Sequence, residues 1–384
     1  MSDKTILILG GGLGGITAAA NLRRLCAPEH RVVVIERSAT FSLRMANLWL
    51  MTGERQHPEE GERSLSQLAE HGIEWVRAEI ESIDPTAKTV KTSTGTFAGD
   101  YLVIALGAER HPEAVPGFAA AALDLYEATG AVRIRHALEE FKGGRVVILV
   151  ARTPFSCPSA PYEAACLVDS VLRRRGVRER SAIGVYTPED IPMLAAGSDV
   201  GEALLRLLKD RGIEFHPEQI VMKVDPAAHL ARFELEDATY DLLIGIPPHR
   251  VPEVLRAAKL ADASGWVPVD PGTLQTRYPG VFAIGDATSI RLPVGMFLPK
   301  AGVFADEQAH VVAENIAAEI AGKVGSRRFN GHGFCYIEVG DDEAAYGAGN
   351  FYGIPAPTVT LEPPSPRYRQ EKHELERTAQ SLWL

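Results

Sequence analysis

The chain has 384 residues, 46% of them hydrophobic, and carries 50 acidic and 40 basic side chains for a net charge of −10. This length and apolar content suffice for two or three domains, each with its own core. Acids are interleaved with the bases, which argues against a nucleic-acid partner. The start, MSDKTILILG, shows no export leader, and no apolar run reaches the ~18 residues that span a bilayer. We therefore expect a cytoplasmic protein, at most peripheral to the inner face of a membrane.

The first 36 residues have the pattern of a nucleotide-binding βαβ unit. Residues 6–9 and 31–35 are short apolar runs, residues 16–25 have helical spacing, and the second run ends at Glu36. Between the first run and the helix lies the loop GGGLGG, whose glycines with motif spacing are Gly10, Gly12 and Gly15. Glycine lets the backbone approach a pyrophosphate at a helix N-terminus, and an acid about 20 residues on binds a ribose hydroxyl. The unit predicts a dinucleotide site with Glu36 on the ribose. A glycine turn without a ligand is the alternative interpretation.

Two later segments indicate which dinucleotide is bound. Residues 100–107, DYLVIALG, form an apolar strand that ends at Gly107. Residues 278–286, YPGVFAIGD, form another that ends in Gly285 and Asp286, before a helix that starts near residue 299. In this order they resemble the ATG-like and GD motifs of flavoproteins with two dinucleotide-binding folds. The resemblance implies that FAD is the cofactor, that Asp286 binds its ribityl and phosphate region, and that the following helix points its N-terminus at the flavin.

A second strand and helix lack the glycine loop. Residues 146–149 predict a buried strand and residues 162–175 an amphipathic helix. The turn between them has no GxGxxG and carries three prolines and Cys157. We therefore predict a Rossmann-like unit that does not bind NAD(P)H. Because a helix N-terminus favours a thiolate, Cys157 is expected to have a lowered pKa and to be reactive.

The predicted fold is α/β, with two Rossmann-like dinucleotide-binding domains as in the glutathione-reductase-like fold and a small C-terminal module. Residues 1–110 and 240–320 are expected to form a discontinuous FAD-binding domain, and residues 111–239 the second domain. The C-terminal module covers residues 321–384. The remaining expected elements are strands at 145–150, 182–186, 220–224, 334–339 and 359–361 and helices at 162–175 and 200–211.

The tail from residue 367 onward is charged and helix-prone. Its apolar face is too thin for a confident membrane anchor, so a solvated or dimer-contacting helix is expected. A homodimer and a peripheral membrane contact both stay open.

The chain has four cysteines, and their number and spacing do not indicate a secreted disulfide framework. Cys26 and Cys166 lie in predicted helices and are interpreted as packing residues, because free cysteine is among the most buried residue types. Cys157 differs by its position in a proline-rich turn. Cys335 lies in the segment GHGFCYIEVG of the C-terminal module.

Segments along almost the whole chain resemble the sulfide:quinone oxidoreductase and flavocytochrome c sulfide dehydrogenase family. The most specific are VFAIGD at 281–286, LPKAGVFADEQAHVVAENI at 298–316, and Cys335. The others are the first glycine loop, CPSAPYE at 157–163, PPHRVP at 247–252 and VPVDPGTLQT at 267–276.

This resemblance implies a mechanism. In that family, two cysteines lie on one face of the isoalloxazine ring, where sulfide attacks their disulfide, a persulfide forms, and a thiolate passes two electrons to the flavin. The pair here would be Cys157 and Cys335, and the substrate sulfide or a related small sulfur compound. The acceptor stays open between a quinone and a c-type cytochrome. Residues 27–156 lack the additional cysteine of the three-cysteine quinone reductases, whereas the flavocytochrome c flavin subunit, which also has two, is exported.

Two further side chains are candidates for chemistry at this site. Glu163 could take or supply the sulfide proton, or it could cap the helix. Lys300, near the start of the helix aimed at the flavin, could stabilise charge on the reduced ring, or it could be a solvated surface lysine.

Aromatic residues near the predicted site could line a quinone pocket, although core packing is their commoner role. These residues are Phe297, Phe304, Phe351 and Tyr352. No histidine has metal-ligand companions at fixed spacing, so no metal site is predicted.

Three functions stay open. The first is an FAD enzyme that oxidises sulfide or a related species through Cys157 and Cys335. The second is an NAD(P)H-dependent flavin disulfide-type reductase in which the cysteines are incidental, and the missing second glycine loop weighs against it. The third is a flavoprotein interaction module with little turnover.

Overall fold

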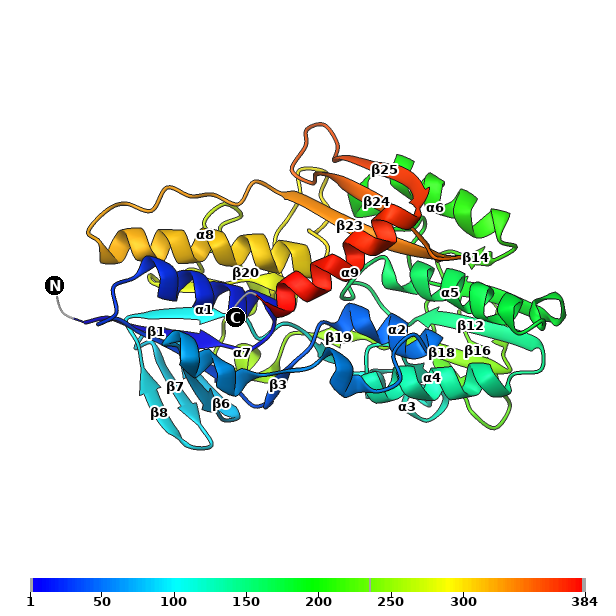
Figure 1. Ribbon diagram of the computed structural model, residues 1–384, viewed down its shortest axis with the longest axis horizontal. Helices are drawn as coiled ribbons and strands as arrows, with labels where there is room; N and C mark the ends of the chain where they lie inside the picture. Colours follow the sequence, from blue (N-terminus) through cyan, green and yellow to red (C-terminus); the bar gives the residue numbers. More distant parts are fainter. Residues whose placement is uncertain (1–2, 235, 382–384) are drawn as a thin grey trace.

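The structure is a computed structural model that describes residues 3–234 and 236–381. Two parallel five-stranded sheets with their helices lie side by side (Figure 1). A three-stranded antiparallel sheet and the C-terminal helix complete the chain near the junction of the two halves (Figure 1). This arrangement confirms the predicted α/β fold with two Rossmann-like cores.

The first sheet has the order β21-β9-β1-β2-β5, and all its pairings are parallel. Its strands are β21 (Val281–Ala283), β9 (Tyr101–Ile104), β1 (Thr5–Leu9), β2 (Arg31–Glu36) and β5 (Glu74–Arg77). The central strand β1 is buried along nearly its whole length, which is why it has a continuous apolar run rather than an alternating pattern. Helices α1 (Leu13–Leu25) and α8 (Gly302–Ile320) pack against each other. Gly14 permits their close approach, since a Cβ there would lie 3.2 Å from the carbonyl oxygen of Ala305.

The second sheet has the order β11-β18-β12-β13-β14 and is also parallel. Its strands are β11 (Leu123–Asp124), β18 (Leu242–Ile246), β12 (Gly144–Val150), β13 (Ser181–Tyr186) and β14 (Glu214–His216). The helices of this half are α2 (Asn47–Thr52), α3 (Phe118–Ala121), α4 (Ala128–Glu140), α5 (Ala160–Arg174) and α6 (Ser198–Asp210). The predicted strands at 145–150 and 182–186 and both predicted helices are therefore present.

Two predicted boundaries in this half are wrong. The strand expected at 220–224 begins at Lys223 and belongs to a separate antiparallel sheet of β15 (Lys223–Asp225), β16 (Leu230–Arg232) and β17 (Asp237–Thr239). The return to the first domain was expected at residue 240, but β18 pairs with β12 and so belongs to the second sheet. The chain crosses back after β18, where β19 (His249–Arg250) pairs with β10 (Glu109–Arg110).

Smaller elements complete the first half. An antiparallel sheet of β6 (Ile80–Asp84), β7 (Thr89–Thr92) and β8 (Gly95–Ala98) extends from its lower edge in Figure 1. The remaining short elements are β3 (Thr40–Phe41), β4 (Arg63–Ser64), α7 (Glu253–Ala257), β20 (Val267–Pro268) and β22 (Thr288–Ser289).

The C-terminal module consists of β23 (His332–Gly340), β24 (Glu343–Asn350), β25 (Thr358–Ser365) and helix α9 (Pro366–Gln380). The sequence predicted β23, β25 and the helical tail but not β24. Residues 382–384 of that tail lie outside the described residues. The expectation that the tail helix is solvated is wrong for one of its faces, because Lys372 and Glu376 are only 3% and 1% exposed. Among residues 3–234 and 236–381, no helix combines the length and apolarity needed to cross a membrane.

Candidate active site

The first glycine loop has the shape of a phosphate cradle. Gly10 has φ +107°, and a Cβ on it would lie 2.4 Å from the carbonyl oxygen of Ala105. A Cβ on Gly15 would lie 2.0 Å from the carbonyl oxygen of Gly10. At Gly12, in contrast, a Cβ would meet no atom within 4 Å. Two glycines thus close the loop onto the protein, and Gly12 at the N-terminus of α1 leaves open space where a pyrophosphate fits.

The other predicted cofactor residues meet at the same edge of the first sheet. Glu36 ends β2, and its carboxylate accepts hydrogen bonds of 2.8 Å from the amides of Gly11 and Ser38. Gly107 follows β9 with φ +66°, and Gly285 follows β21 with φ +67°. Because β2, β1, β9 and β21 are neighbouring parallel strands, their carboxyl ends share one edge, which is where ligands bind in such sheets. The residues fit FAD, because each motif follows a strand of this sheet and all of them reach the same edge.

The cysteine turn of the second domain is bonded to this edge. The Ser156 hydroxyl donates to Asp286 Oδ2 at 2.6 Å, and the Cys157 amide donates to the Lys300 carbonyl oxygen at 2.7 Å. The Tyr126 hydroxyl donates to the carbonyl oxygen of Ser156 at 2.6 Å. The Cys157 amide, which a phosphate at this turn would need, is therefore already bonded to Lys300. This agrees with the missing glycine loop.

Cys157 itself has φ +53°, in the left-handed region that non-glycine residues rarely adopt. This conformation persists because both sides of the residue are bonded: its amide to Lys300, and its carbonyl oxygen to the amide of Ala160 at 3.0 Å. Surrounding structure thus fixes the direction of the Cys157 thiol.

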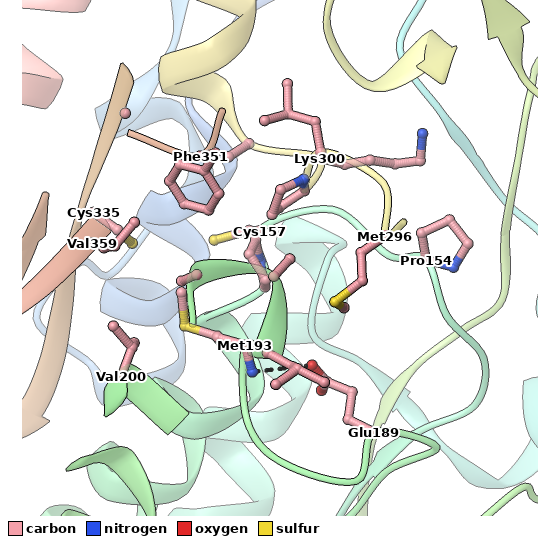
Figure 2. Close-up of a pocket in the computed structure, with 18 of the residues that line it drawn as sticks. Pro154, Cys157, Glu189, Met193, Val200, Met296, Lys300, Cys335, Phe351 and Val359 are labelled. Atoms are coloured by element: carbon pink, nitrogen blue, oxygen red, sulfur yellow. Dashed lines mark hydrogen bonds between the residues drawn. The ribbon is translucent and has the colours of Figure 1, made fainter. Parts of the chain in front are cut away.

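Lys300 is buried, so it is not the solvated surface lysine considered as an alternative. Its Nζ donates to the carbonyl oxygens of Asp286 at 2.6 Å and Thr288 at 3.2 Å and lies 3.3 Å from the centroid of the Trp266 ring. Burial lowers the pKa of Lys300 to about 8, although Asp286 opposes this shift. Figure 2 shows the side chain directed away from Cys157. Helix α8 begins at Gly302, so Lys300 precedes it, and its role at the flavin stays a prediction.

The structure brings the two predicted cysteines together, although they are far apart in the sequence. The Ser159 hydroxyl oxygen lies 3.8 Å from Cys157 Sγ and 3.2 Å from Cys335 Sγ. Both thiols are free, and Figure 2 shows them bordering the same space. Cys26 and Cys166 are buried, as expected for packing residues. The juxtaposition of Cys157 and Cys335 is what a shared redox role requires.

The expectation of a lowered pKa at Cys157 is wrong. Burial and the Glu163 carboxylate raise the pKa of the Cys157 thiol to about 11, outweighing Lys372 and the hydrogen bonds from Ser159 and the Ala160 amide. Helix α5 begins at Ala160, so Cys157 lies outside its first turn. Burial likewise raises the pKa of Cys335 to about 12, with Glu163 and Cys157 adding to the shift. Desolvation of the charged form is stronger here than any helix dipole.

Glu163 is 1% exposed and lies at the centre of a buried polar network. Its Oε2 accepts from the Ser159 hydroxyl at 3.0 Å, and its Oε1 accepts from the Glu338 amide at 2.9 Å and from Lys372 Nζ at 2.5 Å. Lys372 also pairs with Glu338 Oε1 at 2.9 Å. Burial alone would raise the pKa of Glu338, but Lys372 and its other donors lower it overall. The same carboxylates raise the pKa of Lys372, despite its burial. Glu163 therefore does more than cap α5.

Both thiols open into a cavity of about 540 Å³ with mainly apolar walls. Three of the four aromatic candidates line it, namely Phe297, Phe304 and Phe351. Phe304 and Phe351 are buried, whereas Phe297 is 41% exposed. Tyr352 instead packs edge-to-face on Phe329 and donates to the carbonyl oxygen of Pro271.

Several residues of the site were missed in the sequence. Ser159 was visible in the CPSAPYE segment, and its position between Cys157 and Glu163 was the available signal. Lys372 and Glu338 had no comparable signal, because a charged residue on a charged helix normally faces solvent. The spacing of buried positions on α9, at Lys372, Glu376 and Ala379, follows the helical period but carries too little hydrophobicity to be recognised.

The family model "Pyridine nucleotide-disulphide oxidoreductase" matches residues 4–309. The chain is 28% identical over 300 residues to the mitochondrial sulfide:quinone oxidoreductase of Mus musculus, covering 74% of this chain and 66% of that protein, just under two thirds. It is 27% identical over 373 residues to the sulfide-quinone reductase of Aquifex aeolicus (strain VF5), covering 92% of this chain and 84% of that protein. An X-ray structure of the sulfide:quinone oxidoreductase from Aquifex aeolicus matches with a TM-score of 0.89 at 25% identity, covering 99% of this chain and 92% of that one.

Proposed function

The chain belongs to the pyridine nucleotide-disulphide oxidoreductase family and is a flavoprotein oxidoreductase, and on that premise we propose that it oxidises sulfide. In this proposal electrons pass from sulfide through Cys157 and Cys335 to FAD and then to a quinone. The observation that carries it is that both thiols contact one hydroxyl, that of Ser159, at the wall of one apolar cavity. The relatives named sulfide:quinone oxidoreductase support the same substrate and acceptor.

When bound at the first sheet, FAD would supply a two-electron acceptor for the sulfur centre. Gly10, Gly12 and Gly15 would hold its pyrophosphate, Glu36 its adenosine ribose, and Asp286 its ribityl and phosphate region. The bond from Ser156 to Asp286 ties the cysteine turn to that region. This link holds Cys157 at a fixed place relative to the cofactor site.

The sulfur chemistry uses the oxidised form of the cysteine pair. Hydrosulfide attacks the Cys157–Cys335 disulfide, so that one S–S bond breaks, a new one forms as a persulfide, and the other cysteine leaves as a thiolate. Loss of two electrons from the persulfide and thiolate joins them through the added sulfur and releases the persulfide proton. Glu163 receives this proton, because its buried carboxylate is linked to the pair through the Ser159 hydroxyl.

The partly buried position of the two thiols favours electron transfer away from the sulfur. Since burial raises the pKa of both cysteines, a thiolate left in the cavity is a high-energy species and a strong nucleophile. The surrounding walls are mainly apolar, so they offer few polar groups to stabilise a charged sulfur. A thiolate formed there therefore donates its electrons readily to an acceptor such as FAD.

The exposed apolar residues beside the cavity bear on where the quinone enters. Val294 and Phe297 are exposed on a segment that reaches the cavity wall, and we propose that they contact the membrane surface where a quinone resides. The cytoplasmic location, the homodimer and a c-type cytochrome as acceptor stay predictions.

Anaerobic titration of the yellow holoenzyme tests the proposal. Sulfide is expected to bleach the visible flavin band, and NADH is expected to leave it unchanged. Reduced enzyme is then mixed with a soluble quinone or with a c-type cytochrome, and faster reoxidation by the quinone is expected. Bleaching by NADH but not by sulfide would instead support the NAD(P)H-dependent reductase.

A further inference from the structure

A continuous set of hydrogen bonds leads from the thiols to a buried ion pair. The Ser159 hydroxyl lies 3.2 Å from Cys335 Sγ and 3.8 Å from Cys157 Sγ and donates to Glu163 Oε2 at 3.0 Å. A hydroxyl has one proton to donate and two lone pairs that accept. With its proton on the Glu163 side, Ser159 presents lone pairs to the sulfur atoms. A thiol can therefore donate to Ser159 while Ser159 donates to Glu163.

Glu163 has room for one more proton at the correct oxygen. Its Oε1 already accepts from Lys372 Nζ and from the Glu338 amide, whereas its Oε2 accepts from the Ser159 hydroxyl. Because a carboxylate oxygen has two lone pairs, Oε2 retains one beside the Ser159 proton. The other acceptor near Cys335, the Tyr336 carbonyl oxygen at 3.6 Å, is an amide oxygen that does not take up a proton at neutral pH.

Lys372 holds this carboxylate from the opposite side. It comes from α9, at the far end of the chain, is 3% exposed, and pairs with both Glu163 and Glu338. A buried carboxylate without a cation is strongly disfavoured relative to its neutral form. The ammonium of Lys372 therefore supplies the cation that compensates the buried Glu163 carboxylate.

Building on the sulfide chemistry proposed above, we propose that Ser159 and Glu163 carry the thiol proton in series and that Lys372 is a positioning residue for Glu163. In this step the S–H bond of Cys335 or Cys157, or of the persulfide that one of them carries during turnover, breaks and its proton bonds to Ser159 Oγ. The original Ser159 proton bonds to Glu163 Oε2. The negative charge moves from the carboxylate to the sulfur, and the net charge of the buried group stays the same.

Conservation of charge is the physical advantage of this route. Sending the proton to solvent would leave an additional charge in an apolar cavity, and burial opposes that. Exchange within the group avoids this cost.

A double-mutant cycle separates a series from two independent effects. Flavin reduction by sulfide is followed by anaerobic stopped flow in the wild-type holoenzyme, in Ser159→Ala, in Glu163→Gln and in the double variant. Each single change is expected to slow reduction by about 100-fold, as general acid–base catalysis allows. The double variant is expected to be no slower than the slower single variant. Single losses that multiply in the double variant would overturn the series.

Ser170→Ala is the matched control. Ser170 lies on the same helix as Glu163 and is 2% exposed. Its hydroxyl donates to Asp341 Oδ1 and accepts from the Arg174 guanidinium. This variant therefore tests the effect of removing a buried hydroxyl that contacts no thiol. We expect it to react at the wild-type rate.

Alkylation of the thiols tests the relay without sulfide. Iodoacetamide reacts with a thiolate, and peptide mapping reports Cys335 and Cys157 separately in the holoenzyme. We expect Ser159→Ala to slow alkylation of Cys335 by at least about 10-fold at pH 7.5, with Ser170→Ala unchanged. If the wild-type flavin does not respond to sulfide but this loss is seen, the proposed function fails and the relay stands. If Ser159→Ala matches the wild type in alkylation, the relay fails whatever sulfide does.

The role of Lys372 is tested by a pH profile. Glu163 is faced by Lys372 from α9, by Glu338 and Cys335 from β23, and by Cys157 and Ser159 from its own turn, with the Tyr126 phenol nearby. Lys372→Met removes the cation that pairs with the Glu163 carboxylate, so the acid limb of the Cys335 alkylation profile should move to higher pH. Lys372→Arg should restore the limb.

Reduced stability alone would not move this limb. If Lys372→Met does not fold, Lys372→Met combined with Glu338→Gln removes one carboxylate together with the cation and preserves the net charge. The same upward shift is expected in that variant. An acid limb at the wild-type position in the folded variant would overturn the role of Lys372.

Discussion

Replacing Gly12 by alanine should separate FAD binding from folding. A Cβ on Gly12 meets no protein atom within 4 Å, so the apoprotein should fold as the wild type does. The added methyl group occupies the open space in front of the α1 N-terminus, where a pyrophosphate would accept hydrogen bonds from backbone amides. Bonds to a charged group contribute about 1.5–3 kcal/mol each, so losing one of them weakens FAD binding by roughly 10- to 150-fold.

Gly15→Ala is the contrasting change in the same loop. Its Cβ would lie 2.0 Å from the carbonyl oxygen of Gly10, far inside van der Waals contact, so the loop must move. Overpacking of this kind costs about 1–3 kcal/mol or more, and this variant should lose stability as well as FAD. Gly347→Ala is a control, since its Cβ would make an ordinary contact of 3.5 Å with Leu361.

Each apoprotein is titrated with FAD, and binding is measured by the quenching of flavin fluorescence. Thermal unfolding of each apoprotein is measured separately. Gly12→Ala should lose affinity at an unchanged melting temperature, Gly15→Ala should lose both, and Gly347→Ala neither. Wild-type affinity in Gly12→Ala would refute the assignment of this open space to the pyrophosphate.

Three further outcomes are expected. Cys157→Ser and Cys335→Ser should each abolish flavin reduction by sulfide in stopped-flow measurements. The control Cys166→Ser changes a buried cysteine on the same helix as Glu163 and should retain this activity. Reduction at the full rate in Cys157→Ser or Cys335→Ser would contradict the paired mechanism. Because burial lowers the pKa of Lys300 to about 8, against an ordinary value near 10.4, the unfolded chain binds more protons between these values and stability should rise with pH there. Urea unfolding of the wild type and Lys300→Met at pH 7 and pH 10 should show a relative gain for the wild type of roughly 2–3 kcal/mol, and a pH-independent difference would contradict the shift. Asp169 is fully buried beside three arginines. Asp169→Asn should therefore destabilise the apoprotein by about 3–5 kcal/mol in chemical unfolding without altering FAD affinity. A loss of stability below about 1 kcal/mol would show that these ion pairs contribute little.

The cofactor site was predictable because its signals are local. The glycines of residues 10–15, the acid at Glu36 and the turns at Gly107 and Gly285 each belong to a strand end, and a strand can be recognised from its own apolar run. Parallel pairing then brings these ends to one edge without further information. The absence of a second glycine loop was equally local, and the bonds of the cysteine turn agree with it.

The thiol chemistry could not be read in the same way. The sequence suggested a low pKa for Cys157 from a helix start, but a pKa depends on everything that surrounds the group. In the fold, burial and the Glu163 carboxylate outweigh the dipole. The domain boundary at residue 240 was wrong for a related reason, because only strand pairing shows that β18 belongs with β12.

By itself the sequence determined the α/β class and FAD as the cofactor, and it predicted the residues that hold FAD and the cysteines that a family resemblance pairs. Only the tertiary structure decided that Cys157 and Cys335 meet at one hydroxyl, since 178 intervening positions say nothing about distance. It also decided that Lys372 of a charged tail enters the core to pair with Glu163. The physical reason is that periodicity reports which side chains avoid water, whereas the burial of a charge depends on a partner that another part of the chain supplies.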